Sequence, residues 1–220
     1  MAHAVLHPSR RSVGINTIFC IGRNYARHAA ELGNTTEESP VVFLKPVSSV
    51  IHEGSAIELP AISSNVHHEA ELVVLIGKGG RHITRENALQ HVAGYAVGLD
   101  LTARDVQDTL KAKGLPWTIA KGFDTSACLS DFLDAAQLPD PTDLSFTLHV
   151  NGVPRQDGRT AMMLFPVDYI IAYLSSIFTL AEGDIIFTGT PEGVARIEAG
   201  DELLVALNGG PSARFIVSKA

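Results

Sequence analysis

Three acidic side chains stand where the hydrophobic pattern of the chain predicts buried strands. Glu69 and Glu71 begin the run EAELVVLI, which is apolar on both faces beyond them. Side chains two residues apart on a strand share a face, so the two carboxylates point the same way. A strand that is apolar on both faces is buried on both. Asp100 ends the apolar run GYAVGL, where an exposed acid is equally unexpected.

Each acid alone has an ordinary interpretation. Glu69 or Glu71 could belong to a solvated strand end, and Asp100 could cap a helix that starts at Thr102. The two strand carboxylates lie about 7 Å apart and repel by about 2 kcal/mol at an effective dielectric of roughly 20. Partial desolvation adds several kcal/mol per ion. All three acids together therefore favour a cation site, and carboxylates without cysteine favour a hard ion, Mg²⁺, Mn²⁺ or Ca²⁺.

Histidines offer a candidate base. His28 and Glu31 lie three residues apart on an expected helix and share a face. Spacing alone favours a surface ion pair of little energetic worth; the alternative is a base oriented by a carboxylate, since histidine titrates near neutral pH. His67 and His68 precede the acids and are best interpreted as polar packing at a strand start. No second histidine cluster lies at the ligand spacing of a zinc site.

Several cationic and polar residues have two interpretations each. Lys121 either reaches solvent from a strand end or faces an anionic substrate beside the metal. Arg23 and Lys45 share this ambiguity, and solvent exposure is the better expectation for both. Nothing local explains Gln107, one turn along an expected helix. The turn TGTP could present a backbone N–H or the Thr190 hydroxyl to a ligand, or be simply a turn.

Short strands and a few helices must position these residues. The hydrophobic pattern predicts strands over 17–21, 69–76, 94–101, 117–121, 184–187 and 202–207, a strand in PVVFLKP, and a hairpin at Asn151-Gly152. It predicts helices over 24–32, capped by Asn24 and closed by Gly33, over 84–91, from a Thr102 cap to Gly114, and over 168–177. We therefore expect an α+β fold dominated by curved sheet, with short peripheral helices.

Composition excludes several classes of protein. The 220 residues suit one domain, and 45% hydrophobic with 19% charged residues excludes disorder. A net charge of −7, with no basic run longer than Arg10-Arg11, predicts no nucleic-acid partner. No apolar run approaches the roughly 18 residues of a membrane span. Cys20 and Cys128 match no metal or redox spacing and are interpreted as reduced thiols, so we expect a cytoplasmic protein.

Six groups of residues spread over nearly the whole chain form a specific set, although each is weak alone. They are Gly22-Arg23-Asn24-Tyr25, Phe43-Leu44-Lys45-Pro46, His67-His68-Glu69-x-Glu71-Leu72, Leu99-Asp100-x-Thr102-x-Arg104-Asp105-x-Gln107, Lys113-Gly114-x-Pro116-Trp117, and Gly183-Asp184-x-Ile186 with Thr188-Gly189-Thr190-Pro191. Together they resemble the fumarylacetoacetate hydrolase family. The likeness is to its short single-domain branch of acylpyruvases, which includes fumarylpyruvate hydrolases and oxaloacetate decarboxylases.

The resemblance implies an architecture and a set of roles. It implies a mixed, mostly β-sheet roll of the family's C-terminal domain type, forming one catalytic domain over 1–220 and pairing as a homodimer. Residues 1–16 would be an N-terminal lead-in, and 24–39 a lid helix and loop. The implied roles are Mg²⁺ or Mn²⁺ ligation by Glu69, Glu71 and Asp100, a catalytic dyad of His28 and Glu31, an active-site cation at Lys121, and substrate contacts at Arg23, Gln107 and Thr190.

One departure from the family pattern narrows the range of substrates that we expect. The long fumarylacetoacetases supply a fourth acidic ligand shortly before the catalytic histidine, whereas this chain reads Cys20-Ile21-Gly22 there. The short branch shares this absence. Water would complete the shell, and fumarylacetoacetate itself is disfavoured as substrate.

The implied reaction is hydrolysis of 3-acylpyruvates, such as fumarylpyruvate or acetylpyruvate, to pyruvate and a carboxylic acid. The 2-oxo acid would chelate the ion, His28 oriented by Glu31 would activate the water that attacks C4, and Lys121 would stabilise the enolate. Alternatives are oxaloacetate decarboxylation, and hydration or isomerisation of unsaturated 2-oxo acids in aromatic catabolism. A non-catalytic protein that binds metal or oxo acids is a further alternative, against which the candidate base weighs.

Overall fold

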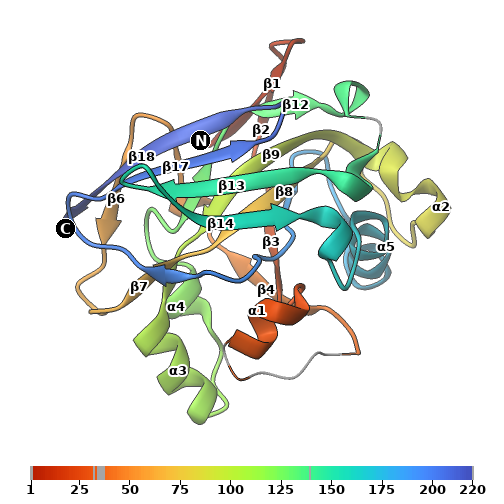
Figure 1. Cartoon of the computed structure of the whole chain (residues 1–220). Coiled ribbons are helices and arrows are strands. Elements are labelled where there is room, and N and C mark those ends of the chain that lie inside the picture. Colours follow the sequence, from red (N-terminus) through yellow and green to blue (C-terminus); the bar gives the residue numbers. More distant parts are fainter. Residues whose placement is uncertain (1, 32, 34–37, 139, 220) are drawn as a thin grey trace.

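A curled ten-stranded sheet dominates the computed structural model, which describes residues 2–31, 33, 38–138 and 140–219 (Figure 1). The strand order is β2-β1-β12-β9-β8-β15-β3-β4, and β11 joins β9 and β5 beside this path. The strands are β1 (His3–His7), β2 (Ser12–Gly14), β3 (Ile18–Gly22), β4 (Val41–Lys45), β5 (Val50–His52), β8 (Ala70–Ile76), β9 (Val92–Asp100), β11 (Ala127–Leu129), β12 (Phe132–Asp134) and β15 (Ile185–Phe187).

Two smaller sheets complete the β structure of the described residues. The five-stranded sheet has the order β14-β13-β17-β18-β6, and the three-stranded sheet has the order β10-β7-β16. Their strands are β6 (Ala56–Leu59), β7 (Val66–His68), β10 (Thr102–Ala103), β13 (Ser145–Val150), β14 (Val153–Arg159), β16 (Ala195–Arg196), β17 (Glu202–Leu207) and β18 (Ser212–Lys219). In Figure 1 the five-stranded sheet lies across β8 and β9.

The helices are short and peripheral. They are α1 (Ala26–Glu31), α2 (Arg85–Ala88), α3 (Arg104–Ala112), α4 (Thr118–Lys121) and α5 (Val167–Ile177), with 3-10 turns at Val47–Ser49, Leu89–His91, Ala135–Gln137, Pro141–Asp143 and Thr160–Met162. Figure 1 shows α1, α3 and α4 at one end of the sheets, while α2 packs on α5. No helix in the described part of the chain is long and apolar enough to span a membrane.

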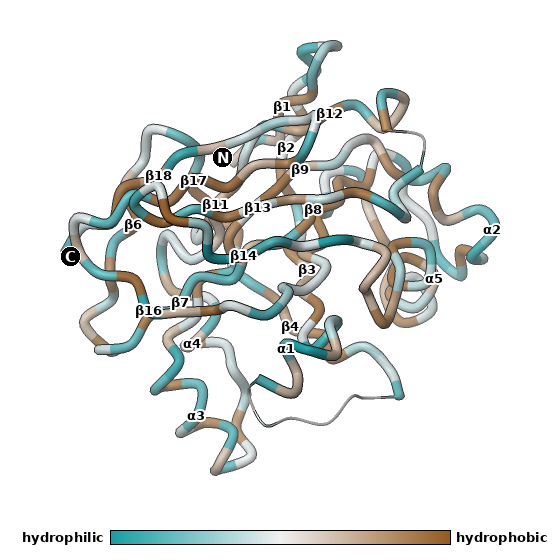
Figure 2. The backbone as a smooth tube through the Cα atoms, viewed as in Figure 1, coloured by the Kyte–Doolittle hydropathy of each residue, from teal (hydrophilic) through white to brown (hydrophobic). Residues whose placement is uncertain are grey.

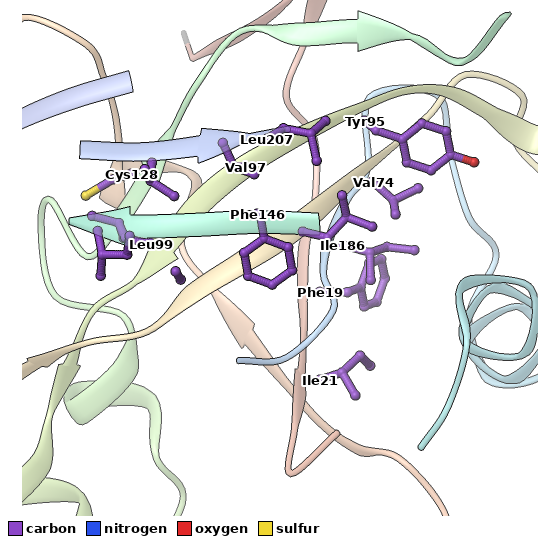
Figure 3. Packing of buried hydrophobic residues seen from close by; sticks show 14 of the residues in the cluster. Phe19, Ile21, Val74, Tyr95, Val97, Leu99, Cys128, Phe146, Ile186 and Leu207 are labelled. Atoms are coloured by element: carbon purple, nitrogen blue, oxygen red, sulfur yellow. The ribbon is translucent and has the colours of Figure 1, made fainter. Parts of the chain in front are cut away.

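The core lies on both faces of the central strands. Every residue of β8 is buried, as its apolar pattern predicts. Val74 joins the cluster between the two large layers and Val73 joins the cluster on the opposite face, as strand alternation requires. Phe146 fills the space between the layers near Val97 and Ile186 (Figure 3). Figure 2 shows hydrophobic residues along these inner strands and mainly hydrophilic ones on α2 and α3.

The predicted fold class is confirmed, and most predicted elements are present. The hairpin turns at Asn151 and Gly152, whose φ angles of 52° and 74° are those of a type I′ turn. Of the segment 1–16, predicted only as a lead-in, residues 3–7 and 12–14 form β1 and β2, and β1 joins the large sheet by pairing with β12. Of the predicted lid segment 24–39, α1 is described, whereas residues 32 and 34–37 lie outside the described part of the chain.

Three local predictions are wrong. The expected strand over 117–121 contains α4 instead, because a short apolar run fits a buried strand and a helical turn equally well. Asn24 does not cap α1: its Oδ1, which a cap would use, accepts from the Phe165 N–H at 2.7 Å, and its Nδ2 donates to the Thr188 carbonyl at 2.7 Å. Thr102 belongs to β10, and its hydroxyl bonds the Asp100 carbonyl at 3.1 Å instead of capping α3. Asn24 is thus bonded to partners distant in the chain, whereas Thr102 is bonded within its own strand turn.

Candidate functional site

The three predicted acids lie together at the end of the central strands. Glu69, Glu71 and Asp100 are 4%, 2% and 1% exposed, and each offers an oxygen within 4.8 Å of the others. Antiparallel pairing of β8 with β9 brings them together, and the Asp100 N–H donates to the Glu69 carbonyl at 2.8 Å. Glu69 itself falls between β7 and β8. The solvated strand end and the helix cap are therefore both wrong for these residues.

Two buried lysines neutralise part of this charge. Lys121 Nζ donates to Glu69 Oε2 at 2.6 Å and to Asp100 Oδ2 at 2.7 Å. Lys45 Nζ lies 2.7 Å from Asp100 Oδ1 and donates to the Ser126 carbonyl at 3.0 Å. The lysines are only 3% and 4% exposed. Solvent exposure, the expectation for Lys45 and one alternative for Lys121, is therefore wrong for both.

The carboxylates differ in electrostatic environment. Burial alone would raise the pKa of Glu69, but Lys121 and Arg104 more than offset this and hold it well below its usual range. Burial, then repulsion by Asp100 and Glu69, raises the pKa of Glu71 well above its ordinary value. Its Oε2 accepts from the Gly189 N–H at 2.7 Å. Buried carboxylate oxygens converging on one point, with one pKa raised by its neighbours, fit a hard divalent cation.

His28 and Glu31 project from α1 beside these acids. His28 is 6% exposed, and its Nδ1 lies 3.5 Å from Glu31 Oε2. The Glu31 side chain is 36% exposed and also accepts from the Gly193 N–H at 3.2 Å. The surface pair favoured by spacing alone is thus wrong for the histidine. Burial lowers the pKa of His28, although Glu69 and Glu31 pull it upward, so the imidazole is neutral at pH 7 and can accept a proton.

One cavity gathers nearly all the predicted site residues. Of the nine, only Glu31 is absent from its described lining, and it reaches the cavity through His28. The lining is Ile21, Gly22, Arg23, His28, Phe43, Glu69, Glu71, Asp100, Arg104, Gln107, Lys111, Trp117, Lys121 and Thr190. The chain therefore brings acids, cations and a neutral imidazole to one place, as general acid–base chemistry on an anionic ligand requires.

Two predicted ligand contacts already have protein partners. Gln107 Oε1 accepts from Arg104 Nη1 at 2.7 Å, and Arg104 also bonds Glu69. The Thr190 hydroxyl donates to the Ala70 carbonyl at 2.8 Å and accepts from Gln156 Nε2 at 2.8 Å. The hydroxyl thus ties its turn to β8, and Thr190 lines the cavity. Sequence reasoning gave no site role to Arg104, although its three-residue spacing from Gln107 puts both on one helix face.

The two histidines before the acids pack as the sequence suggested. His67 Nε2 lies 3.1 Å from Asn65 Oδ1, and burial lowers the pKa of His67 to about 4. His68 Nδ1 lies 3.0 Å from Gln156 Oε1. Neither belongs to the possible metal-ligand group found among the described residues.

Comparisons with known proteins agree with this geometry. Residues 17–217 match the family model described as fumarylacetoacetate (FAA) hydrolase C-terminal. The mitochondrial oxaloacetate tautomerase FAHD1 of Mus musculus is 49% identical over 203 residues, 92% of each chain. A mitochondrial oxaloacetate decarboxylase of Dictyostelium discoideum is 45% identical over 193 residues, 87% of this chain and 88% of its own.

A solved structure resembles the whole chain. It is fumarylpyruvate hydrolase from Pseudomonas aeruginosa in complex with Mn²⁺ and pyruvate, at a TM-score of 0.94 and 40% identity, covering 100% of this chain and 96% of that one. The likeness in fold therefore extends over the whole chain.

Proposed function

This chain belongs to the fumarylacetoacetate hydrolase family, and from that premise we propose that it is a metal-dependent enzyme that tautomerises oxaloacetate. The observation that carries the proposal is the convergence of three buried acids, Lys121 and a neutral His28 in one cavity. The 49% identity to an oxaloacetate tautomerase over 92% of both chains supports it.

The acids are the proposed ligands of Mg²⁺ or Mn²⁺. Glu69, Glu71 and Asp100 offer oxygens within 4.8 Å of one another, and the solved relative with Mn²⁺ supports the choice of a hard ion. When bound, the ion supplies Lewis-acid polarisation of the substrate's 2-oxo group and carboxylate. Cys20 and Ile21 add no acidic ligand, so water would fill the remaining positions.

The chain's own residues move the proton. Nδ1 of His28 faces Glu31, which leaves Nε2 for the substrate in the cavity. Tautomerisation breaks a C3–H bond and forms an O–H bond on the 2-oxo oxygen. Nε2 takes the proton from C3 and returns it to that oxygen, so the proton count balances. Lys121, whose ammonium lies among the acids, stabilises the negative charge that develops on the oxygen.

The test follows the enol form of oxaloacetate by its ultraviolet absorbance after rapid mixing with protein and Mg²⁺. We expect the parent protein to accelerate enol–keto exchange, and Lys121→Ala to lose most of that acceleration while still binding metal. Arg27→Ala is a matched control on α1, because Arg27 is an exposed residue 3.3 Å from Glu192 and outside the cavity lining. Exchange at the uncatalysed rate with the metal-loaded parent would overturn the proposal.

Hydrolysis of 3-acylpyruvates is the second candidate. Similarity of the whole chain to a fumarylpyruvate hydrolase favours it. His28 would then deprotonate a water that attacks C4; the C3–C4 bond breaks, and pyruvate and a carboxylic acid result. Pyruvate release from fumarylpyruvate, acetylpyruvate and oxaloacetate, with and without metal, separates hydrolysis from decarboxylation. Failure to release pyruvate from either acylpyruvate would remove this candidate.

The homodimer and the cytoplasmic location stay predictions. β4 is the outer strand of the large sheet, and its Leu44 is 46% exposed near Leu115, which is 49% exposed, along one apolar hollow. Such an edge suits pairing with a second copy. Light scattering of the purified chain tests the dimer, and localisation of the tagged chain tests the compartment, since relatives include mitochondrial proteins.

A further inference from the structure

One wall of the cavity carries a row of polar side chains from α3. Arg104, Gln107 and Lys111 lie three and four residues apart, so they occupy one face of the helix, and all three line the cavity. Arg104 marks the deep end through its bond to Glu69. Lys111, whose side chain is 25% exposed, marks the outer end. Helical side chains lean toward the N-terminus of their helix, which directs the Lys111 ammonium back along the row.

The surroundings of Lys111 hold its charge at the cavity without neutralising it. Nζ lies 5.7 Å from the centroid of the Trp117 ring, which also lines the cavity. Its carboxylate partner, Asp108 Oδ1, is 3.8 Å away on a side chain that is 63% exposed, and such pairs contribute little. Burial, then repulsion by Arg104, lowers the pKa of Lys111. An anionic group arriving here would relieve that repulsion.

The charges along the cavity favour binding of a second anionic group. Four cationic side chains line it, Arg23, Arg104, Lys111 and Lys121, whereas its three carboxylates all belong to the acid group. A divalent ion among those acids makes the cavity more positive still. The proposed substrate contacts at the metal use one carboxylate and the 2-oxo group. They leave Lys111, at the outer end, with the exposed Asp108 carboxylate 3.8 Å away as its ion-pair partner.

Resting on the proposed function, we propose that Lys111, supported by the Trp117 ring, binds the distal carboxylate of the substrate. The enzyme therefore selects 2-oxo dicarboxylates over 2-oxo monocarboxylates of the same length. A charge-assisted hydrogen bond of this kind gives about tenfold to a hundredfold discrimination. Lys121 and Arg104 act at the inner end, where every 2-oxo acid is alike, so they do not distinguish the two classes.

Binding can be measured without turnover. Trp117 is the single tryptophan of the chain and lines the cavity, so its fluorescence reports ligands there. With Mg²⁺ present, oxaloacetate is titrated within seconds of mixing and compared with 2-oxobutanoate, which has a methyl group in place of the distal carboxylate. We expect the parent to favour oxaloacetate by at least about tenfold. Lys111→Met should remove this preference by weakening oxaloacetate binding alone, and Lys111→Arg should restore part of it.

Lys113→Met is the matched control. Lys113 follows the same helix, is exposed and does not line the cavity, so its loss should leave the preference unchanged. Equal affinity of the parent for both ligands would overturn the inference, as would equal weakening of both by Lys111→Met. A protein that prefers oxaloacetate but does not accelerate enol–keto exchange would refute the proposed function and keep this inference. A protein that accelerates enol–keto exchange but binds both ligands equally would keep the proposed function and refute this inference.

Discussion

The cavity has two parts that are held in different ways. Its floor, defined as Glu69, Glu71, Asp100 and Lys121 together with Lys45 behind the lining, is buried, and three ion pairs within it span 2.6 to 2.7 Å. Its rim, defined as His28 and Glu31 on α1 with Lys111 on α3, has pairs of 3.5 and 3.8 Å and partners that are partly exposed.

This difference separates binding of the metal from selection and proton transfer. The floor grows out of β8 and β9, so its geometry is as rigid as the core itself. The rim is fastened by contacts that are weak in water, which lets it adjust to a substrate. Breaking a buried ion pair costs about 3–5 kcal/mol, whereas an exposed pair contributes about 0–1 kcal/mol. Substitutions in the two parts should therefore separate stability from activity.

The largest effect should come from Asp100→Ala in the floor. It removes one proposed metal ligand and leaves two buried ammonium groups without their shared carboxylate. We expect loss of metal-dependent activity and a fall of about 3–5 kcal/mol in the free energy of unfolding, measured by urea denaturation. Chelation of the parent should likewise abolish activity, and Mg²⁺ should raise the parent's Tm but not the variant's.

Asp108→Ala is the control for that substitution. Its carboxylate is 63% exposed at the rim, so the free energy of unfolding should change by less than about 0.5 kcal/mol. Full activity of the parent after exhaustive chelation, or an Mg²⁺-dependent Tm in Asp100→Ala, would show that the floor is not a metal site.

Lys45→Met should destabilise the fold almost as much without touching the cavity. Lys45 is absent from the described lining, yet its ammonium pairs with Asp100 and donates to the Leu101 carbonyl at 3.3 Å. We expect a loss of about 3 kcal/mol in the free energy of unfolding, because a buried carboxylate loses one of two partners. The rim variant Lys111→Met should lose less than about 1 kcal/mol. Equal losses in the two variants would erase the distinction between floor and rim.

His28→Ala should lower activity and leave stability nearly unchanged, in contrast to Lys45→Met. We expect proton transfer to slow by about 10² or more, the usual contribution of a general base, with little change in the free energy of unfolding. Acylpyruvate hydrolysis, if present, should fall similarly because it needs an activated water, while oxaloacetate decarboxylation should be spared more. The measurement compares the three rates in one preparation. Equal losses in hydrolysis and decarboxylation would instead indicate a binding contact.

The same division explains what the sequence could predict. The acids of the floor were found because carboxylates interrupt apolar strands, a local signal. The burial of Lys45 was missed because its partner Asp100 is distant in the chain, and a lysine that ends a strand is usually exposed. The prediction of a strand over 117–121 was wrong because the four residues of α4 are too few to show a helical period.

Rim residues were harder to recognise. His28 and Glu31 looked like a surface pair because spacing along a helix says nothing about what covers it. Lys111 carried no local signal at all: its role depends on Trp117, Arg104 and the shape of the cavity. The dyad was predicted only from the resemblance to a family. The row of Arg104, Gln107 and Lys111 on α3 became recognisable only in the tertiary structure.

The smallest effect should come from Glu31→Gln, and it should appear mainly in the pH dependence. Glu31 raises the pKa of His28, which burial holds below its ordinary value of 6.5. Removing the charge should lower this pKa further and cost about tenfold in rate, since Glu31 orients the base and does not itself move the proton. The acid limb of the rate profile should therefore move to lower pH.

The stability of the fold should also depend on pH through His28. The folded state binds the His28 proton less tightly than the unfolded chain does. The contribution of neutral His28 to the free energy of unfolding is therefore complete above pH 6.5 and is lost as pH falls below that value. The Tm of the parent should drop across this window more than that of His28→Ala, and Glu31→Gln should drop at least as steeply as the parent. An acid limb that moves upward in Glu31→Gln would show that the carboxylate does not act on His28.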